Sequence, residues 1–266
     1  EEDILYVKGS GRNLATIDAE GFTPLRLTNI KKLAELVHIS DTMMVLEQQL
    51  TMTNPDAPSP SVEALLHAII PFSWIDHTHA DAVVTLTNTP KGEKLIQDVY
   101  GDRLLIIPYV MPGFKLARKV FEITQKVDWQ QYEGMILLNH GIISFGAEAH
   151  ESYERMINAV TLAEKFLKKH SSLPKNNIKK KAPALHQETL RKLARIRKKV
   201  SNIRGAASLA RLNNSPEARV FSGLPNIKKI STRGPITSDH LIRTKPAPMY
   251  LNQKNVEKSI EDFASK

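Results

Sequence analysis

Residues 74–84 read WIDHTHADAVV, with two histidines, His77 and His79, two positions apart. If the backbone is extended there, side chains at i and i+2 point to the same face, so both imidazoles can reach one metal ion while Thr78 points away. Neutral imidazole is a common ligand of zinc and its neighbours in the first transition row. Such a pair also arises by chance in a chain with 9 histidines, so a metal site requires ligands from elsewhere in the sequence.

His140 supplies a third imidazole. It follows the apolar run 135–138, which predicts a buried strand, and it precedes a glycine. Three protein ligands leave one position of the metal open, which is typical of catalytic rather than structural sites. Asp76 and Asp81 are candidates for accepting the second ring N–H of a ligand, and we place Asn139 with them. The alternative is a structural histidine at a strand end, and the residues alone leave both interpretations open.

The composition limits the kinds of protein that this chain can be. Its 266 residues are 41% hydrophobic and 24% charged, which is ordinary for a globular chain of one large or two small domains. We expect no membrane span, because no apolar run reaches about 18 residues, and no secretory signal, because the chain opens without a basic segment. The absence of cysteine excludes thiolate metal ligands and disulfides, and it fits a reducing, cytoplasmic environment.

The net charge is +9, with an isoelectric point near 9.6. Much of this charge lies in the second half, for example in the run 179–181 and in RIRKK at residues 195–199. A basic segment of this kind is more often a solvated helix face than a specific reader of nucleic acid, so we do not expect a nucleic acid partner.

Hydrophobic periodicity predicts a mixed α/β chain. Strand patterns cover residues 4–7, 22–27, 82–86, 103–108, 135–138 and 142–146, and helix patterns cover 31–38, 41–48, 62–70, 93–100, 114–127, 147–169, 185–203 and 256–264. Asp41 and Ser61 are the expected caps of the second and third helices, and residues 222–225 and 232–240 are expected to be loops. We expect residues 1–170 to form a metal-binding core and residues 171–266 a basic helical extension packed on the same domain.

A glycine-containing loop, KGSGR at residues 8–12, follows the first predicted strand. It is not a dinucleotide fingerprint, because Leu14 occupies the third glycine position and no helix pattern follows at once. One interpretation is a simple tight turn. The other is an anion-binding loop, in which glycines let backbone N–H groups approach closely and Ser10 adds a hydroxyl donor.

Taken together, separate blocks of this sequence resemble a known family. The blocks are PSVE at residues 60–63, HTHAD at 77–81 and LNHGIISFG at 138–146. In this order and spacing they resemble the signature blocks of the class II aldolase/adducin family. The loop KGSG at 8–11 and the tail blocks at 232–240 and 243–245 look like the aldolase half of bifunctional rhamnulose-1-phosphate aldolase/short-chain dehydrogenases.

The resemblance implies a fold and a site. The fold would be a three-layer α/β/α domain with a mostly antiparallel central sheet and extra C-terminal helices. The implied site has His77, His79 and His140 as ligands of a divalent metal, zinc in most of the family, with Glu63 as the acid/base carboxylate and Ser10, Gly11 and Ser61 at the substrate phosphate. The family pattern has two hydroxyl residues before the carboxylate, and Val62 replaces the second of them here.

The implied reaction is retro-aldol cleavage of a ketose 1-phosphate, with L-rhamnulose 1-phosphate as the expected substrate and dihydroxyacetone phosphate and L-lactaldehyde as products. A divalent cation stabilises the enediolate charge left by cleavage, while the carboxylate moves the proton. Two alternatives share the resemblance: a pentulose-phosphate 4-epimerase, and a non-catalytic adducin-like binding module. Family members are commonly homotetramers, so we expect a homo-oligomer that binds a phosphorylated sugar.

Overall fold

The computed structural model describes residues 2–170, 186–237, 240, 244–251 and 255–265. The chain divides into two compact units, Glu1–His170 and Ser171–Lys266, and each is described by itself. The prediction that the second packs on the first as one domain stays a prediction. None of the helices in the described part of the chain has the length and apolar character that a membrane crossing requires.

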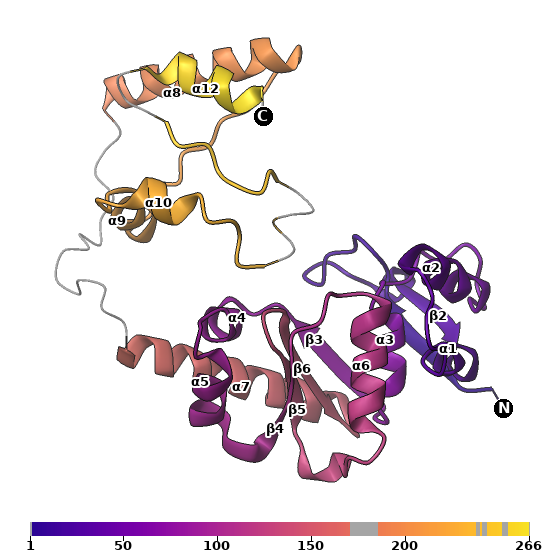
Figure 1. Ribbon diagram of the computed structural model, residues 1–266. Coiled ribbons are helices and arrows are strands. Elements are labelled where there is room, and N and C mark those ends of the chain that lie inside the picture. Colours follow the sequence, from indigo (N-terminus) through magenta and orange to yellow (C-terminus); the bar gives the residue numbers. More distant parts are fainter. Residues whose placement is uncertain (1, 171–185, 238–239, 241–243, 252–254, 266) are drawn as a thin grey trace. The chain divides into compact units, whose positions relative to one another are not determined.

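A four-stranded sheet forms the centre of the first unit (Figure 1). Its order is β3 (Trp74–Thr78), β6 (Gly141–Gly146), β5 (Gly134–Leu137) and β4 (Leu104–Ile107). The pairs β3–β6 and β6–β5 are antiparallel, and only β5–β4 is parallel. The predicted mostly antiparallel sheet is therefore confirmed.

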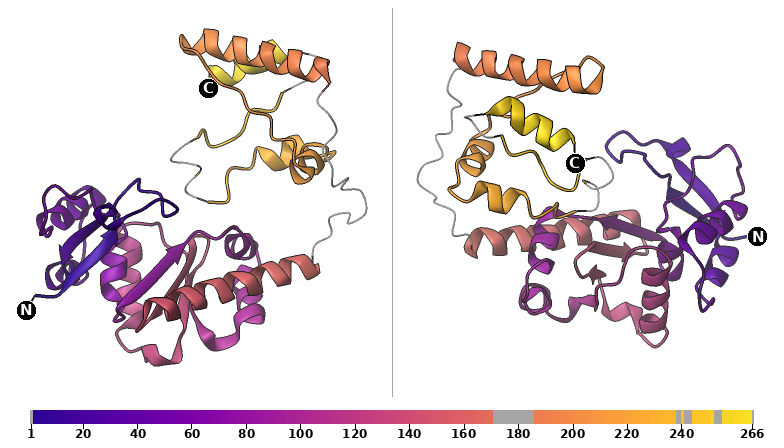
Figure 2. Two further views of the ribbon diagram at one scale, coloured as in Figure 1. Left: turned by 180° about the vertical axis from the view of Figure 1, so that it is seen from behind. Right: turned by 45° about the horizontal axis from the view of Figure 1, so that its top comes forward.

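Helices cover both faces of this sheet. Successive strand residues point to opposite faces, so neighbouring residues of one strand pack into different cores. Met135 and Leu137 of β5 pack with α3 (Ala64–Ile69) and α6 (Phe114–Thr124) in one core. Ile136 of β5 packs into a second core, with α4 (Asp81–Thr87), α5 (Gly92–Tyr100) and α7 (Ala149–His170). Figure 2 shows α7 running across its face of the sheet. The three-layer α/β/α prediction is confirmed.

A smaller antiparallel ribbon, β1 (Ile4–Lys8) and β2 (Phe22–Arg26), lies apart from this sheet. It is followed by α1 (Leu27–Leu33) and α2 (Asp41–Leu50). Short 3-10 turns cover Ala19–Gly21, Gly101–Arg103 and Trp129–Gln131. An isolated bridge between Gly9 and Pro60 joins the loop after β1 to the segment that precedes α3.

Several predicted boundaries in the first unit are wrong. Residues 82–86 form helix α4 rather than a strand, because the helix buries Val83, Val84 and Leu86 together, and this packing outweighs the β preference of the valines. The helix predicted over 31–38 is α1, which begins at Leu27 and ends at Leu33.

Two predicted helix caps also differ from the structure. Ser40, not Asp41, caps α2 by accepting the N–H of Met43, while Asp41 accepts the N–H of Phe114. Helix α3 begins at Ala64, so Ser61 lies before it and accepts the N–H of Glu63.

The second unit contains helices α8 (Gln187–Arg204), α9 (Pro216–Ser222), α10 (Ile227–Ser231) and α12 (Val256–Ala264). Sequence patterns predicted α8 and α12 but missed α9 and α10, although Ser215 and Pro216 form an ordinary helix start. Acidic residues of α12 pair with basic residues of α8, Glu257 with Arg195 and Glu261 with Lys199.

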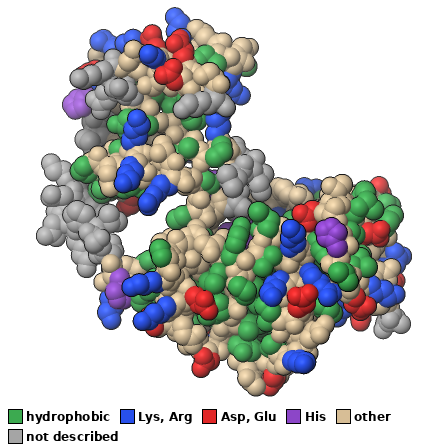
Figure 3. Space-filling model, in the orientation of Figure 1, with side chains coloured by type: hydrophobic (Ala, Val, Ile, Leu, Met, Phe, Trp, Pro, Cys, Tyr) green, Lys and Arg blue, Asp and Glu red, His purple; other side chains and the backbone are tan. Residues whose placement is uncertain are grey.

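Positive charge is concentrated in the second unit. Residues 171–266 hold 21 Lys and Arg against 6 Asp and Glu, whereas residues 1–170 hold 16 against 22. Lys and Arg side chains lie on the visible surface of both units (Figure 3). The unit that carries the three histidines is therefore net acidic.

Candidate metal centre

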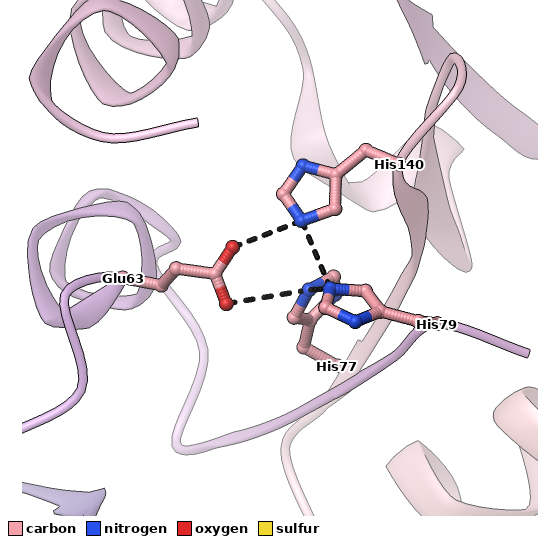
Figure 4. A group of neighbouring side chains, drawn as sticks. All are labelled: Glu63, His77, His79 and His140. Atoms are coloured by element: carbon pink, nitrogen blue, oxygen red, sulfur yellow. Dashed lines mark hydrogen bonds and ion pairs between the residues drawn. The ribbon is translucent and has the colours of Figure 1, made fainter. Parts of the chain in front are cut away.

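Four side chains from three segments of the first unit converge on one point: Glu63, His77, His79 and His140 (Figure 4). One ligand atom from each lies within 4.8 Å of the others. The Nε2 atom of His79 lies 3.1 Å from that of His77 and 3.0 Å from that of His140. The Glu63 carboxylate completes the group, with Oε1 3.0 Å from His140 Nε2 and Oε2 3.4 Å from His77 Nε2.

The sheet brings the three histidines together. His77 lies near the end of β3 and His79 follows that strand, so their rings share one side, as the spacing predicts. Thr78 points the other way and its hydroxyl contacts the sulfur of Met156 in α7. His140 belongs to the three-residue connection between β5 and β6, and the antiparallel pairing of β6 with β3 places it beside His79.

Gly141 has no side chain, and the rings of His77 and His79 pack against its backbone. A Cβ atom at this position would stand 2.5 Å from the carbonyl oxygen of Thr78. It would also stand 3.1 Å from ring carbons of both His77 and His79. The glycine after His140 is thus required by packing against the other two histidines.

The hydrogen-bonding groups of the cluster suit a cation. His77 Nδ1 lies 3.0 Å from the carbonyl oxygen of Ile142, so Nδ1 carries the proton and Nε2 presents a lone pair. The Nε2 atom of His79 can carry at most one proton, yet this atom faces two imidazole nitrogens. A zinc ion about 2.1 Å from each nitrogen would separate them by about 3.4 Å, close to the observed spacing. The donor set therefore fits a divalent metal.

Burial and charge set the protonation of the cluster. Burial by itself would raise the pKa of Glu63, but the hydrogen bond with His140 and the charges of the three histidines outweigh it and lower the pKa to about 2. Burial lowers the pKa of His77 to about 4, against the opposing effect of Glu63. At neutral pH the cluster thus contains an ionised carboxylate and a neutral His77, which are the forms that bind a metal.

Asp76, Asp81 and Asn139 are the residues predicted to orient the metal ligands. Asp76 accepts a hydrogen bond from the Ser152 hydroxyl at 2.7 Å, and Asn139 donates to Asn88 at 2.6 Å. Asp81 is the first residue of α4 and is exposed. Their orienting role stays a prediction.

The loop that carries Ser10 and Gly11 is hydrogen-bonded to the segment that carries Ser61, and the role of these residues in phosphate binding stays a prediction. The N–H of Ser10 donates to the carbonyl of Ser59, and the N–H of Ser61 donates to the carbonyl of Lys8. Gly11 adopts the left-handed conformation, with φ of 76°, which a glycine adopts without strain. The loop after β1 therefore lies against the residues that lead to Glu63, with Ser10 and Gly11 exposed.

Sequence patterns missed four contributors to the site: the Ile142 carbonyl, Gly141, Asn88 and His67. The His67 ring packs edge-on against His77, with ring centres 6.4 Å apart, and burial lowers its pKa. His67 follows Glu63 by one helical turn, which is a signal that the sequence contains. The other three depend on strand pairing and on a side-chain contact across 51 positions, which no local pattern reports.

Comparison with known proteins assigns the family. The sequence model of the Class II Aldolase and Adducin N-terminal domain matches residues 1–167, and that of the Aldolase class II second domain matches residues 187–266. The fold and the four-residue cluster agree with this match. The chain belongs to the class II aldolase and adducin family.

Two relatives illustrate the extent of the similarity. The N-terminal class II aldolase domain of a conserved protein from Thermoplasma acidophilum is 40% identical, with a TM-score of 0.57 over 62% of this chain and 75% of that one. The uncharacterized oxidoreductase YuxG of Bacillus subtilis (strain 168) is 29% identical over 260 residues, which are 95% of this chain. The chain spans 37% of the length of YuxG.

Proposed function

We propose that this chain is a divalent-metal-dependent aldolase that cleaves a ketose 1-phosphate by retro-aldol chemistry. The observation that carries the proposal is the convergence of Glu63 and three imidazole Nε2 atoms on one point, in a chain of the class II aldolase and adducin family. The expected substrate is L-rhamnulose 1-phosphate, supported by the resemblance of the loop and tail blocks to the aldolase half of a bifunctional enzyme.

His77, His79 and His140 would hold the ion through Nε2. Imidazole binds a metal in its uncharged form, so an ion held by these three ligands would keep most of its positive charge. When bound, the ion supplies Lewis-acid stabilisation of negative charge on adjacent substrate oxygens. The carbonyl of Ile142 keeps the Nε2 atom of His77 unprotonated and ready for this role.

Glu63 is the group that would move the proton. Its carboxylate lies against His77 and His140 and is ionised, with the pKa lowered to about 2. Cleavage of the bond between C3 and C4 requires the C4 hydroxyl to lose its proton as the aldehyde forms, and Glu63 accepts that proton. The bonding electron pair stays with the three-carbon phosphate fragment, which then takes up a proton to give dihydroxyacetone phosphate.

The loop after β1 would hold the substrate phosphate. Ser10 and Ser61 offer hydroxyl groups, and the backbone at Gly11 can approach an anion closely because no side chain intervenes. Backbone hydrogen bonds tie this loop to the residues just before Glu63. Phosphate binding there would place the sugar chain toward the carboxylate and the histidines.

The test is metal analysis of the purified chain together with a coupled assay for dihydroxyacetone phosphate on L-rhamnulose 1-phosphate. We expect about one divalent ion per chain and release of the three-carbon phosphate, and we expect both to be lost in His140→Ala. The control is His150→Ala, whose side chain is 86% exposed.

Other outcomes would replace the proposal. A metal-loaded chain that epimerises ribulose 5-phosphate, without releasing dihydroxyacetone phosphate, would be a pentulose-phosphate 4-epimerase. A chain that binds no divalent metal would exclude both the aldolase and the epimerase, and would leave the adducin-like binding module as the alternative.

A further inference from the structure

The connection that carries His140 is tied to a distant side chain. Asn139 Nδ2 donates a hydrogen bond to Asn88 Oδ1 at 2.6 Å, across 51 positions of sequence. Asn88 is the residue after α4, and Asn139 lies between β5 and β6. We infer that Asn88 is a positioning residue of the metal centre, acting through Asn139 on His140. This inference rests on the proposed metal-binding function.

The ring of His140 is held at Nε2, by Glu63 and His79, but not at its second nitrogen. Its Nδ1 atom is buried and has no hydrogen-bond partner among the residues that the structure describes. His77 differs, because the Ile142 carbonyl holds its Nδ1 at 3.0 Å. Ligand histidines are usually oriented by a hydrogen bond to the second ring nitrogen. Apart from the Nε2 contacts, the direction of the His140 ring is therefore set by the backbone of the connection and by packing.

The backbone of that connection is in an unfavourable conformation. Asn139 has φ of 59° and is the only non-glycine residue with positive φ in the part of the chain that the structure describes. This left-handed conformation costs an ordinary residue about 1 kcal/mol or more, and asparagine tolerates it best. The hydrogen bond to Asn88 stabilises it. The contact therefore maintains the turn that directs His140 toward the cluster.

Helix α4 lies between His79 and Asn88 in the sequence. It begins two residues after His79 and ends one residue before Asn88. Val83, Val84 and Leu86 are buried, so the helix is fixed in the core and acts as a rigid spacer. At one end of the helix His79 Nε2 lies 3.0 Å from His140 Nε2, and at the other end Asn88 holds Asn139. The two contacts together fix the separation of His79 and His140.

The test measures metal binding by the full chain, independently of activity. The variants are Asn88→Ala, Asn88→Asp and Asn139→Gly; the aspartate keeps the acceptor oxygen, and the glycine keeps the positive φ. The readouts are the Zn²⁺ dissociation constant, from competition with a chromophoric chelator, and the visible spectrum of the Co²⁺-loaded protein. The control is Gln97→Ala, which removes another exposed side-chain hydrogen bond, from Gln97 to Asp102 at 2.8 Å.

We expect Asn88→Ala and Asn139→Gly each to weaken Zn²⁺ binding about tenfold and to alter the Co²⁺ spectrum. Asn88→Asp and Gln97→Ala should stay within about twofold of wild type, and the double variant Asn88→Ala/Asn139→Gly should be no weaker than either single one. If Asn88→Ala does not fold, Asn139→Gly tests the same contact.

Wild-type affinity and spectrum in Asn88→Ala, or an Asn88→Asp variant as weak as Asn88→Ala, would overturn the positioning role. A wild-type chain that binds neither Zn²⁺ nor Co²⁺ would instead overturn the proposed function.

Discussion

His77 Nδ1 lies 3.0 Å from the carbonyl oxygen of Ile142, the residue that pairs with Thr78 across β3 and β6. The contact makes the orientation of His77 in the candidate metal centre depend on the register of the sheet. A slip of one residue between these strands would turn Thr78, rather than His77, toward the cluster. The pairing that builds the core therefore also selects the ring nitrogen that a metal can bind.

The Gly141→Ala variant should lose both stability and metal affinity. The added Cβ would stand 2.5 Å from the Thr78 carbonyl oxygen and would press on the rings of His77 and His79. Overpacking of this kind costs about 1–3 kcal/mol, and we expect a lower melting temperature and roughly tenfold weaker Zn²⁺ binding. Gly223→Ala is the control, because its Cβ would meet nothing closer than 3.2 Å. Unchanged Zn²⁺ affinity in Gly141→Ala would contradict the packing argument.

The sequence predicts a strand or helix correctly where its hydrophobic pattern is typical of the burial that the element has in the fold. β5 and β6 are apolar runs buried on both sides, and all six residues of β6 are buried. The run at 82–86 has a similar apolar composition but forms α4, so a short apolar segment does not by itself separate a strand from a buried helix. Only the packing partners of Val83 and Leu86 in the second core decide between the two.

The sequence predicts which residues form the candidate site, but it does not predict the contacts that hold them in place. The three histidines could be found from their spacing and from the strand end at His140, and Glu63 from the resemblance to the family. The carbonyl of Ile142 has no signal of its own, because any residue carries one, and its role arises only from strand register. Asn88 lies 51 positions from its partner and likewise needed the three-dimensional structure.

Replacing Glu63 by glutamine should separate metal binding from proton transfer. Glu63→Gln keeps the size of the side chain but removes its charge and its ability to accept a proton. We expect turnover of the ketose phosphate to fall by about 10²–10⁴-fold. Zn²⁺ affinity should fall by about tenfold at most, because the three imidazoles remain.

Glu164→Gln, at an exposed position of α7, is the matched control for this substitution. If Glu63→Gln turned over substrate at the wild-type rate with full metal content, Glu63 would have no part in proton transfer.

Two neighbouring serines offer a test of phosphate recognition. Ser61→Ala should raise KM for the phosphorylated ketose about tenfold, the effect of losing one hydrogen bond to a charged group. Ser59→Ala should change KM little, because the Ser59 hydroxyl accepts a hydrogen bond from Gln49 at 3.2 Å. The effect of Ser61→Ala should vanish for the same ketose without phosphate. An equal effect on both ketoses would show that Ser61 does not contact the phosphate.

The stability of the second unit should depend more on the burial of Ile260 than on the ion pairs between α12 and α8. Ile260 of α12 is 4% exposed, whereas Glu261, which pairs with Lys199, has a side chain 55% exposed. Ile260→Ala should destabilise this unit by about 2–4 kcal/mol, and Glu261→Gln by less than about 1 kcal/mol. Amide hydrogen exchange across residues 187–204 would measure the difference. Similar exchange rates in the two variants would contradict this ranking.

Acid should destabilise the metal-free protein through His77. Burial lowers the pKa of His77 from the ordinary 6.5 to about 4, so between these values the unfolded chain binds a proton that the folded chain does not. Stability rises with pH wherever the unfolded state binds more protons, and it is therefore lost as pH falls from about 6.5 toward 4. The full shift corresponds to roughly 3 kcal/mol. Glu63, with its pKa lowered from 4.5 to about 2, extends the loss below pH 4.5.

Melting temperatures of the metal-free chain between pH 8 and pH 4.5 would measure this loss. His77→Asn should show a shallower decline, because it lacks the buried imidazole, whereas His150→Asn should follow the wild type, since that side chain is exposed. Zn²⁺ should flatten the wild-type decline near pH 6.5 and lose this effect at lower pH, because protons and the metal compete for the same nitrogen. Parallel curves for wild type and His77→Asn would show that another group causes the acid sensitivity.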